Sequence, residues 1–219
     1  MIIDFTKLTS AQRYFAMVQC IVPRPIAWVL TPNGDLESGE PYNYNLAPYS
    51  FFTGICSSPP LIMLSAGKKP SGKDAGETKD TAKNILRHKH FVVHIASTNQ
   101  VDDLNASAQT LDYGQSEIDK QALMLAEFPG FNLPRLQNCK VAMACRLYSS
   151  HEIGDAPQTI VYGEIKQLYI DDTITNSEEY LNNPDSRLII DPEALDPLAR
   201  LGGNAYSQIG AKFDVKRPT

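Results

Sequence analysis

Two stretches of this 219-residue sequence combine residue types that are suited to holding a ligand. The first is Tyr42–Ser50, in which amides, hydroxyls and aromatic rings surround an Ala-Pro pair that would interrupt strand pairing. An interrupted strand leaves backbone N–H and C=O groups free to bind a flat heterocycle. On the pattern alone, a plain connection between two strands is the simpler interpretation.

The second stretch is Thr78-Lys79-Asp80-Thr81, at the start of a predicted helix. Free amides and the positive end of a helix suit a phosphate, and Lys79 and Thr81 would add a charge and a hydroxyl. The segment Lys68–Lys89 holds seven basic residues against three acidic ones, which fits a small anionic ligand or a solvated face equally well. The alternative for this stretch is an ordinary helix start with Thr78 as the N-cap.

Two other patterns suggest chemistry but lack a necessary part. Gly67–Lys73 matches the phosphate-binding G-x-x-x-x-G-K loop, but Asp74 stands where a Ser or Thr must reach magnesium. A P-loop hydrolase rests on this near-match alone. His90 and His94 would lie about 13 Å apart along a strand, too far to share a metal ion. We therefore expect no metal site, and the sequence contains neither G-x-S-x-G nor G-x-G-x-x-G.

Around these stretches the sequence pattern predicts mainly strands. The expected strands are Ile26–Thr31, Tyr42–Leu46, Ser50–Cys56, Leu61–Ala66, Phe91–Ala96, one with Cys139, Val141, Met143, Cys145 and Leu147 on a shared face, and Ile160–Ile170. Asn33-Gly34 indicates a hairpin, and the apolar phase slips near Lys166-Gln167, as it does at a β-bulge.

Helices are expected in three places. They are Ser10–Gln19 with Ser10 as its cap, a helix after Thr78 with Ala82, Ile85 and Leu86 as its apolar stripe, and Ser116–Phe128 capped by Ser116 or Asp119. The last fifty residues look like an irregular surface tail. Six or more strands with few helices favour a mainly β fold, a closed barrel with helical additions. An α/β sheet is the alternative, but helices and strands do not alternate regularly.

Length and composition restrict the class of protein further. A chain of this length predicts one domain, 1–219. Its net charge of −5 argues against a nucleic-acid binder, and its apolar runs fall far short of the ~20 residues of a membrane span. No export signal is visible, so the four cysteines are expected to be reduced and the protein cytoplasmic.

Several segments together resemble a known family, the flavin reductase-like proteins with the FMN-binding split-barrel fold. The resemblance is carried by Pro23–Val29, Asn45–Phe52, Ser58–Pro60, Lys79–Ile85 and Gly154–Ile165, in register along the chain. It implies a six-stranded barrel over about residues 20–170 and a tail over 171–219. It also implies bound FMN and a homodimer with the flavin near the subunit interface.

The resemblance also implies which residues contact the cofactor. The isoalloxazine ring and ribityl chain would be lined by Asn45, Leu46, Ala47, Pro48, Tyr49 and Ser50. Ser65 and Ala66 would lie on the neighbouring strand end. Lys79, Asp80 and Thr81 would hold the phosphate, with Arg24 and Tyr206 as further contacts.

The implied function is electron transfer from NAD(P)H through FMN to free flavin, a partner monooxygenase or a metal, without a side-chain nucleophile. Many members read Gly-Asp-His where this chain reads Gly154-Asp155-Ala156, so the histidine near the nicotinamide is missing. His151 lies a few residues upstream and is the candidate replacement. The alternative function is a non-catalytic FMN-binding electron carrier.

Overall fold

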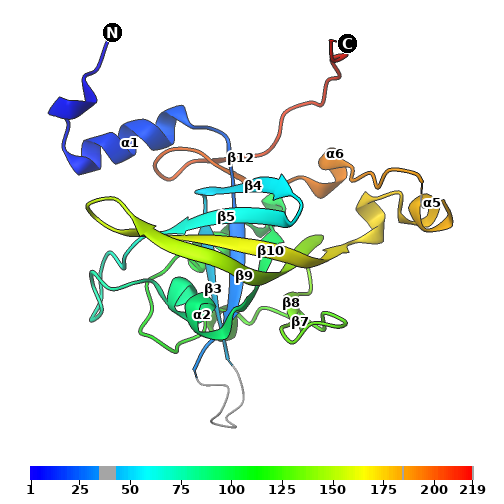
Figure 1. Ribbon diagram of the computed structural model, residues 1–219, viewed down its shortest axis with the longest axis horizontal. Helices are drawn as coiled ribbons and strands as arrows, with labels where there is room; N and C mark the ends of the chain where they lie inside the picture. The colour runs from blue at the N-terminus through cyan, green and yellow to red at the C-terminus, as the bar shows by residue number, and fades with distance from the viewer. Residues whose placement is uncertain (35–42, 184, 219) are drawn as a thin grey trace.

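The computed structural model describes residues 1–34, 43–183 and 185–218. Its main element is a seven-stranded antiparallel sheet in the order β3-β2-β6-β9-β10-β5-β4 (Figure 1). The strands are β2 (Ala27–Pro32), β3 (Tyr44–Tyr49), β4 (Phe52–Ser57), β5 (Pro60–Ala66), β6 (His90–Ile95), β9 (Val141–Ile153) and β10 (Gln158–Ile170). The expected mainly β barrel with helical additions is confirmed, with seven strands in the sheet, one more than the six-stranded barrel that the resemblance implied.

The curled sheet buries apolar side chains on both of its faces. Inside the curl, residues of β2, β5, β6, β9, β10 and helix α2 (Asp80–His88) form one core, which includes Val29, Phe91 and Val161. A second core on the outer face packs Trp28, Leu30 and neighbouring strand residues against two helices and a pair of short strands. These are α3 (Val101–Ala106), α4 (Glu117–Gln121), β7 (Leu125–Ala126) and β8 (Arg135–Leu136). Strands buried on both faces need not alternate polar and apolar residues.

This two-sided burial changes the face predicted for the cysteine strand. Met143, Cys145 and Leu147 do share the inner face, but Ala142 and Ala144 are buried on the outer face. Cys139 precedes β9 and packs into the outer core, so the prediction that it shares a face with Met143, Cys145 and Leu147 was wrong.

The predicted hairpin and bulge are both present, but the predicted interruption of strand pairing at Ala47-Pro48 is wrong. Ala47 pairs with Val29 and Pro48 with Trp28 inside β3, because a proline is tolerated in an edge strand. β2 pairs with β3, and Asn33 N–H donates to Asn43 O at 3.0 Å at the start of their connection. Tyr42, which was predicted in the returning strand and the ligand stretch, lies outside the described residues. The β9–β10 register shifts between Ile165 and Gln167, as the apolar phase indicated.

The helices differ from their predictions mainly at their ends. Helix α1 (Ser10–Cys20) is capped by Thr9, whose hydroxyl accepts from Gln12 N–H, and not by Ser10. The N-cap of helix α2 is Lys79 and not the predicted Thr78, and the helix begins at Asp80. Leu86, which was predicted in its apolar stripe, is exposed. Helix α4 is capped by Ser116 as expected, but it ends at Gln121 because Ala122 turns left-handed with φ 51°. The chain then pairs β7 (Leu125–Ala126) with β8 (Arg135–Leu136).

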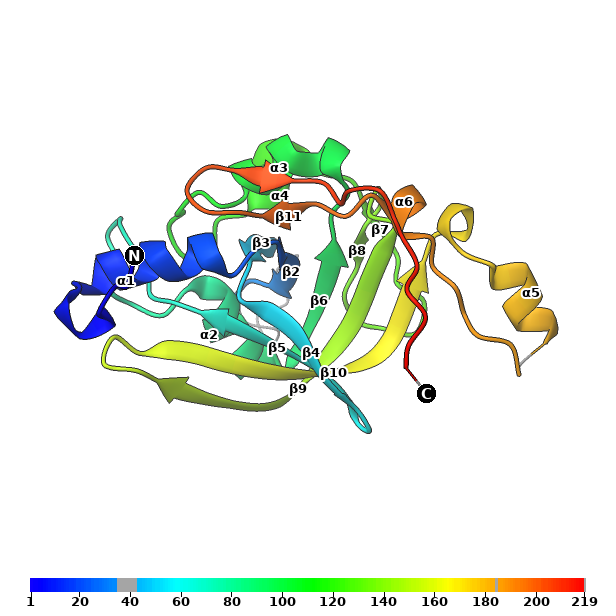
Figure 2. The ribbon, with the colours of Figure 1, turned by 90° about the horizontal axis from the view of Figure 1, so that it is seen from above.

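The expected irregular tail is partly ordered by pairing with the N-terminal region. β11 (Ala199–Arg200) pairs with both β1 (Arg24–Pro25) and β12 (Tyr206–Ser207) in a three-stranded sheet. Figure 2 shows this returning segment passing over α3 and α4. The remaining short helices are η1 (Phe5–Lys7), η2 (Thr98–Gln100), η3 (Asp172–Ile174), α5 (Ser177–Asn182) and α6 (Pro192–Leu195).

No helix among the described residues is both long and apolar enough to cross a bilayer. No group of three or more His, Cys, Asp or Glu side chains in the same part of the chain is placed to hold a metal ion.

Candidate functional site

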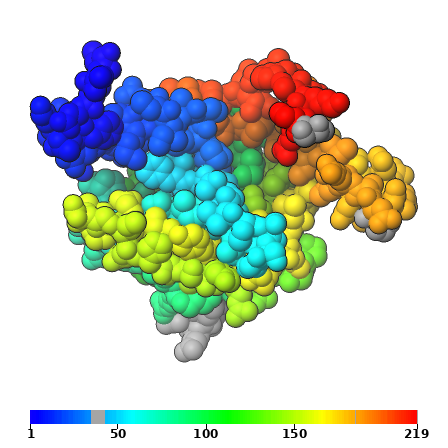
Figure 3. All heavy atoms as spheres, turned by 45° about the horizontal axis from the view of Figure 1, so that its top comes forward, coloured from blue at the N-terminus to red at the C-terminus, as the bar shows by residue number. Residues whose placement is uncertain are grey.

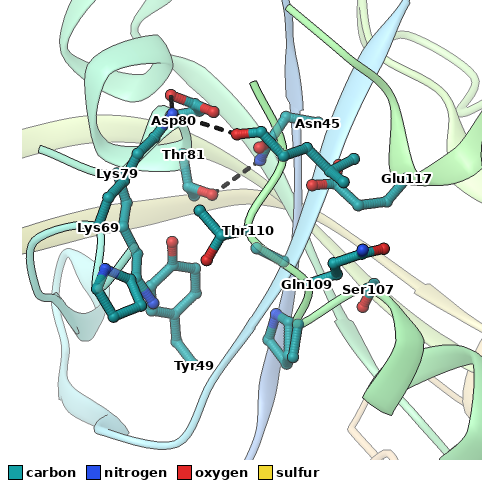
Figure 4. A pocket seen from close by; sticks show the side chains of 15 residues that line it. Asn45, Tyr49, Lys69, Lys79, Asp80, Thr81, Ser107, Gln109, Thr110 and Glu117 are labelled. Atoms are coloured by element: carbon teal, nitrogen blue, oxygen red, sulfur yellow. Dashed lines mark hydrogen bonds and ion pairs between the residues drawn. The ribbon is translucent and has the colours of Figure 1, made fainter. Parts of the chain in front are cut away.

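Two adjoining pockets bring the predicted ligand-binding stretches together. The first, which we call the α2 pocket, lies between the start of α2, strand β3 and the segment after α3 (Figure 4). Its lining is Asn45, Ala47, Pro48, Tyr49, Lys69, Pro70, Lys79, Asp80, Thr81, Ser107–Leu111 and Glu117. The second, the Tyr14 pocket, shares Pro48, Tyr49, Pro70 and Lys79 and adds Tyr14, Ser50, Phe51, Ser65, Gly67, Lys68 and Gln158. The shared residues make them neighbouring compartments of one hollow.

Most of the residues predicted to contact a cofactor line this hollow, and four do not. Leu46 and Ala66 are fully buried in the two cores. Tyr206 stacks under the guanidinium of Arg200 and donates from its hydroxyl to Asn105 Oδ1 at 3.1 Å. Arg24, the fourth, is described below.

Helix α2 begins at the edge of the hollow without a side-chain cap. Lys79 is its N-cap residue and makes no capping hydrogen bond, which leaves the first-turn amides without a side-chain acceptor. Thr78, the predicted cap, instead accepts from Lys68 Nζ at 3.0 Å. The Lys79 ammonium lies 5.3 Å from the centre of the Tyr49 ring and has no carboxylate partner among the described residues. Burial lowers the pKa of Lys79, so an anion at this point would relieve an uncompensated charge.

Tyr49 presents a second unsatisfied group to the same hollow. The residue is only 5% exposed, and its hydroxyl makes no hydrogen bond of regular geometry in the described part of the chain, although the Thr81 side chain partly opposes the effect of burial on its pKa. Burial raises the pKa of Tyr49 well above its ordinary value, so the hydroxyl keeps its proton. A buried hydroxyl without a partner is unusual in a folded protein and fits a site where a ligand supplies one.

Lys69 and Asp80 form a buried ion pair at the base of the same helix. Lys69 Nζ lies 2.9 Å from Asp80 Oδ1 and 3.2 Å from Asp74 Oδ2. Burial favours the neutral amine, but the hydrogen bonds and charges of Asp80 and Asp74 outweigh it and raise the pKa of Lys69. Asp80 therefore has Lys69, and not Lys79, as its ion-pair partner.

The same loop shows why the G-x-x-x-x-G-K match is not a phosphate cradle. The Lys73 side chain is 84% exposed and pairs with Asp112 at 3.4 Å, away from the hollow. The chain turns at residues 73–76, and the next helix begins only at Asp80. A P-loop needs a helix directly after its lysine, so this class loses its only support.

A buried amide network fixes α2 against the β2–β3 hairpin. Asn45 Nδ2 donates to Thr81 Oγ1 at 2.8 Å. Asn84 Nδ2 donates to Thr31 Oγ1 at 3.1 Å and to Asn33 Oδ1 at 3.0 Å. Buried amides tolerate little displacement, because an unpaired one is costly. The network therefore holds the start of α2 at a fixed position beside β3.

Arg24 contacts the hollow only indirectly, through Ser50. Its Nε donates to Ser50 Oγ at 3.3 Å, and its Nη atoms donate to the carbonyl oxygens of Val18, Ile21 and Leu201. Because these bonds occupy its guanidinium, Arg24 ties α1 and the C-terminal segment to Ser50 and lines neither pocket.

Sequence reasoning missed Lys69, Glu117 and the segment Ser107–Leu111. Lys69 lay inside the basic run, but nothing in the sequence marked it as the one that would be buried. Glu117 is 5% exposed, and its Oε2 accepts from Leu46 N–H at 2.9 Å. It follows the helix cap Ser116, and only tertiary packing brings it to β3, which no local pattern indicates.

Neither Ala156, which stands where many family members have a histidine, nor the candidate replacement His151 lies at the hollow. Ala156 is exposed in the turn between β9 and β10, and it lines neither pocket. His151 stacks on Tyr162 with ring centres 5.7 Å apart and does not line the pockets either.

Comparison with known proteins agrees with this architecture. The model of the flavin reductase like domain matches residues 18–187. The structure is similar to nitrilotriacetate monooxygenase component B from Bacillus cereus, with 27% identity, a TM-score of 0.83 and 98% of each chain covered. It is also similar to the 2-nitrobenzoate 2-nitroreductase NbaA from Pseudomonas fluorescens, with 25% identity, a TM-score of 0.82, and 100% of this chain and 97% of that chain covered. A split barrel protein from Shewanella frigidimarina shares the fold over 100% of both chains, with 17% identity and a TM-score of 0.78. The chain therefore belongs to the flavin reductase like domain family and has its split-barrel fold.

Proposed function

We propose that this protein holds FMN in the hollow formed by the α2 and Tyr14 pockets and passes electrons from NAD(P)H through it to an acceptor. The observation that carries the proposal is Lys79, a partly buried ammonium at the uncapped start of α2 that has no carboxylate partner among the described residues. Its position suits a phosphate monoester, and FMN is the flavin that ends in one. The buried, unpartnered Tyr49 hydroxyl beside it is the second sign of a ligand.

The residues of the hollow divide into a phosphate end and a ring end. Lys79, Thr81 and the first-turn amides of α2 would hold the phosphate, with Asp80 fixing the turn through Lys69. Among the described strands β3 pairs with β2 alone, so backbone groups on its free edge have no strand partner, and Asn45, Ala47, Pro48 and Tyr49 line the hollow. These groups and Ser65 would contact the ring. Arg24 would orient Ser50, and Leu46, Ala66 and Tyr206 would support the site from behind.

Bound FMN would supply the hydride and single-electron chemistry, and the protein would position it and exclude water. The lining offers no activated nucleophile, because Tyr49 keeps its proton at Oη and Lys69 is held in an ion pair. Lys79 would remain a cation in contact with the phosphate. The proposed reaction is therefore oxidoreduction without a covalent protein intermediate.

We further propose that the protein works as a homodimer in the reducing cytoplasm. Helix α1 buries only Val18, and exposes Tyr14, Phe15 and Met17 beside the exposed strand β4 (Figure 3). Exposed apolar surface of this kind favours association, and a second copy would cover it next to the Tyr14 pocket. All four cysteines are free, which agrees with a reducing compartment.

The acceptor is proposed as a partner monooxygenase, free flavin or another small oxidant. Two similar proteins are a component of a monooxygenase and a nitroreductase, and both kinds of acceptor are consistent with a hollow that opens to solvent.

The second candidate function is an electron carrier that has no nicotinamide site of its own. It is favoured by one observation, the absence of any histidine from the lining of both pockets. Anaerobic stopped-flow mixing of the FMN-loaded protein with NADH and NADPH separates the two functions, with dithionite as the reference reductant. Saturable reduction by a nicotinamide supports the oxidoreductase. Reduction by dithionite alone supports the carrier.

A further inference from the structure

Glu117 places a buried carboxyl group inside the proposed phosphate pocket. It projects from α4, and Figure 4 shows it across the α2 pocket from Lys69 and Lys79. The Leu46 N–H, which lies on the free edge of β3, donates to Glu117 Oε2 at 2.9 Å. The carboxyl group thus satisfies a backbone amide that the sheet leaves unpaired, at the centre of the Asn45–Ser50 segment.

The charges around Glu117 do not hold it in one protonation state. Asp80 of α2 and Glu117 repel each other, although Asp80 is paired with Lys69. Lys79 lies on the far wall beside Tyr49, whose hydroxyl is protonated, and Lys120 is exposed on the same helix as Glu117. Burial, opposed by the Leu46 hydrogen bond, raises the pKa of Glu117 to about 7. Both forms are therefore populated near neutral pH.

An anion that enters the α2 pocket adds a second negative charge close to this carboxylate. Like charges in a partly desolvated site favour the protonated form. A protonated carboxyl group keeps one carbonyl oxygen, which can still accept from Leu46 N–H. Protonation therefore removes the repulsion without releasing β3.

We propose that Glu117 is a positioning residue that takes up a proton from solvent when the phosphate of FMN binds, so that FMN affinity falls as pH rises. This inference rests on the proposed function. Linkage gives the direction of the pH dependence. Because bound FMN raises the pKa of Glu117, FMN affinity is greatest at a pH below the Glu117 pKa of the free protein. The affinity then falls with rising pH and levels off above the Glu117 pKa of the complex.

The test is isothermal titration calorimetry of the FMN-free chain with FMN, in two buffers of different ionisation enthalpy. For wild type we expect Kd to rise about tenfold between about pH 6.5 and about pH 8.5, where the phosphate is already largely dianionic. We also expect uptake of about half a proton per FMN near pH 7.5. Riboflavin, which lacks the phosphate, should bind with much less proton uptake.

Glu117→Gln is the decisive variant, because its amide oxygen can still accept from Leu46 N–H while its charge does not titrate. It should bind FMN with a nearly constant Kd and without the proton uptake. Asp119→Asn makes the same charge change at an exposed position of α4 and should behave as wild type.

The outcomes distinguish this inference from the proposed function. FMN binding without proton uptake in wild type, or with the same pH profile in Glu117→Gln, overturns the role of Glu117 and leaves the proposed function standing. Absence of proton uptake in wild type overturns the role of Glu117 even if the variant does not fold, and uptake that persists in Glu117→Gln assigns the proton to another group such as Lys79. Failure of wild type to bind FMN at any pH overturns both.

Discussion

At the scale of single residues, a buried charge or hydroxyl without a partner destabilises the fold unless a ligand supplies one. Lys79 and Tyr49 are two such residues, and their side chains meet at the boundary of the α2 and Tyr14 pockets. Lys69, Asp74 and Asp80 contrast with them, because each of these three is ion-paired within the protein. The difference separates the residues that we propose hold a ligand from those that stabilise the loop.

Replacing Lys79 by alanine should weaken FMN binding more than riboflavin binding, because only FMN carries the phosphate. A charge-assisted hydrogen bond contributes about 1.5–3 kcal/mol, so we expect at least a tenfold rise in Kd for FMN. Quenching of flavin fluorescence measures both ligands. Lys73→Ala is the matched control and should change neither Kd, because Lys73 is exposed and pairs with Asp112. Equal losses for the two flavins would show that the start of α2 does not contact phosphate.

Tyr49→Phe should have opposite effects on the free protein and on the complex. Removing a buried hydroxyl that has no partner should raise the free energy of unfolding of the ligand-free chain by about 1 kcal/mol. It should also weaken FMN binding, because the ligand loses a hydrogen-bonding group. Urea denaturation and a flavin titration measure the two effects. A loss of stability in the free chain would mean that the hydroxyl is already satisfied.

At the scale of elements, His94 links strand β6 by hydrogen bonds to strands β8 and β2. Its Nε2 accepts from Leu136 N–H of β8 at 2.9 Å, so Nδ1 carries the proton and donates to Trp28 O of β2 at 3.1 Å. This is a core histidine and not a metal ligand. Burial lowers the pKa of His94 to about 4, from an ordinary value near 6.5.

The linkage of His94 to folding predicts acid sensitivity. Because the folded-state pKa lies below the unfolded-state pKa, stability is lost as pH falls from about 6.5 toward about 4. Between about pH 6.5 and pH 5 the loss should be about 2 kcal/mol. Denaturant unfolding of wild type and His94→Gln should show a smaller loss in the variant. His90→Gln, on the same strand, should keep the wild-type loss, and an equal loss in all three proteins would contradict this assignment.

The elements also show what local sequence can determine. The β10 bulge was predicted because a phase slip at Lys166-Gln167 is a property of adjacent residues. The length of α4 was not predicted, because the residues after Gln121 still favour a helix. In the structure Leu125 and Leu136 instead pair in β7 and β8 and pack into the outer core. In the site, Asn45, Tyr49 and Lys79 lie in short motifs and were found. Glu117 and Ser107–Leu111 reach the pocket only through the folding of distant segments.

At the scale of the whole molecule, the exposed apolar surface of α1 and β4 predicts self-association. Tyr14 packs edge-on against Phe51 with ring centres 6.5 Å apart, which holds α1 beside the Tyr14 pocket. Phe15 is exposed next to it, so Phe15→Glu should place a charge in a dimer interface and shift the equilibrium toward monomer by tenfold or more. Light scattering after gel filtration measures the shift. Leu181→Glu, a similarly exposed position on α5, is the control, and a wild-type chain that stays monomeric would contradict the proposed dimer.

We propose above all that this split barrel holds FMN in the hollow at the start of α2. The most direct measurement is the visible absorption spectrum of the purified chain after incubation with FMN and removal of free ligand. We predict a yellow protein that retains the absorption bands of an oxidised flavin in stoichiometric amount, and Lys79→Ala should retain markedly less. A colourless wild-type protein that takes up no FMN at micromolar concentration would contradict the claim.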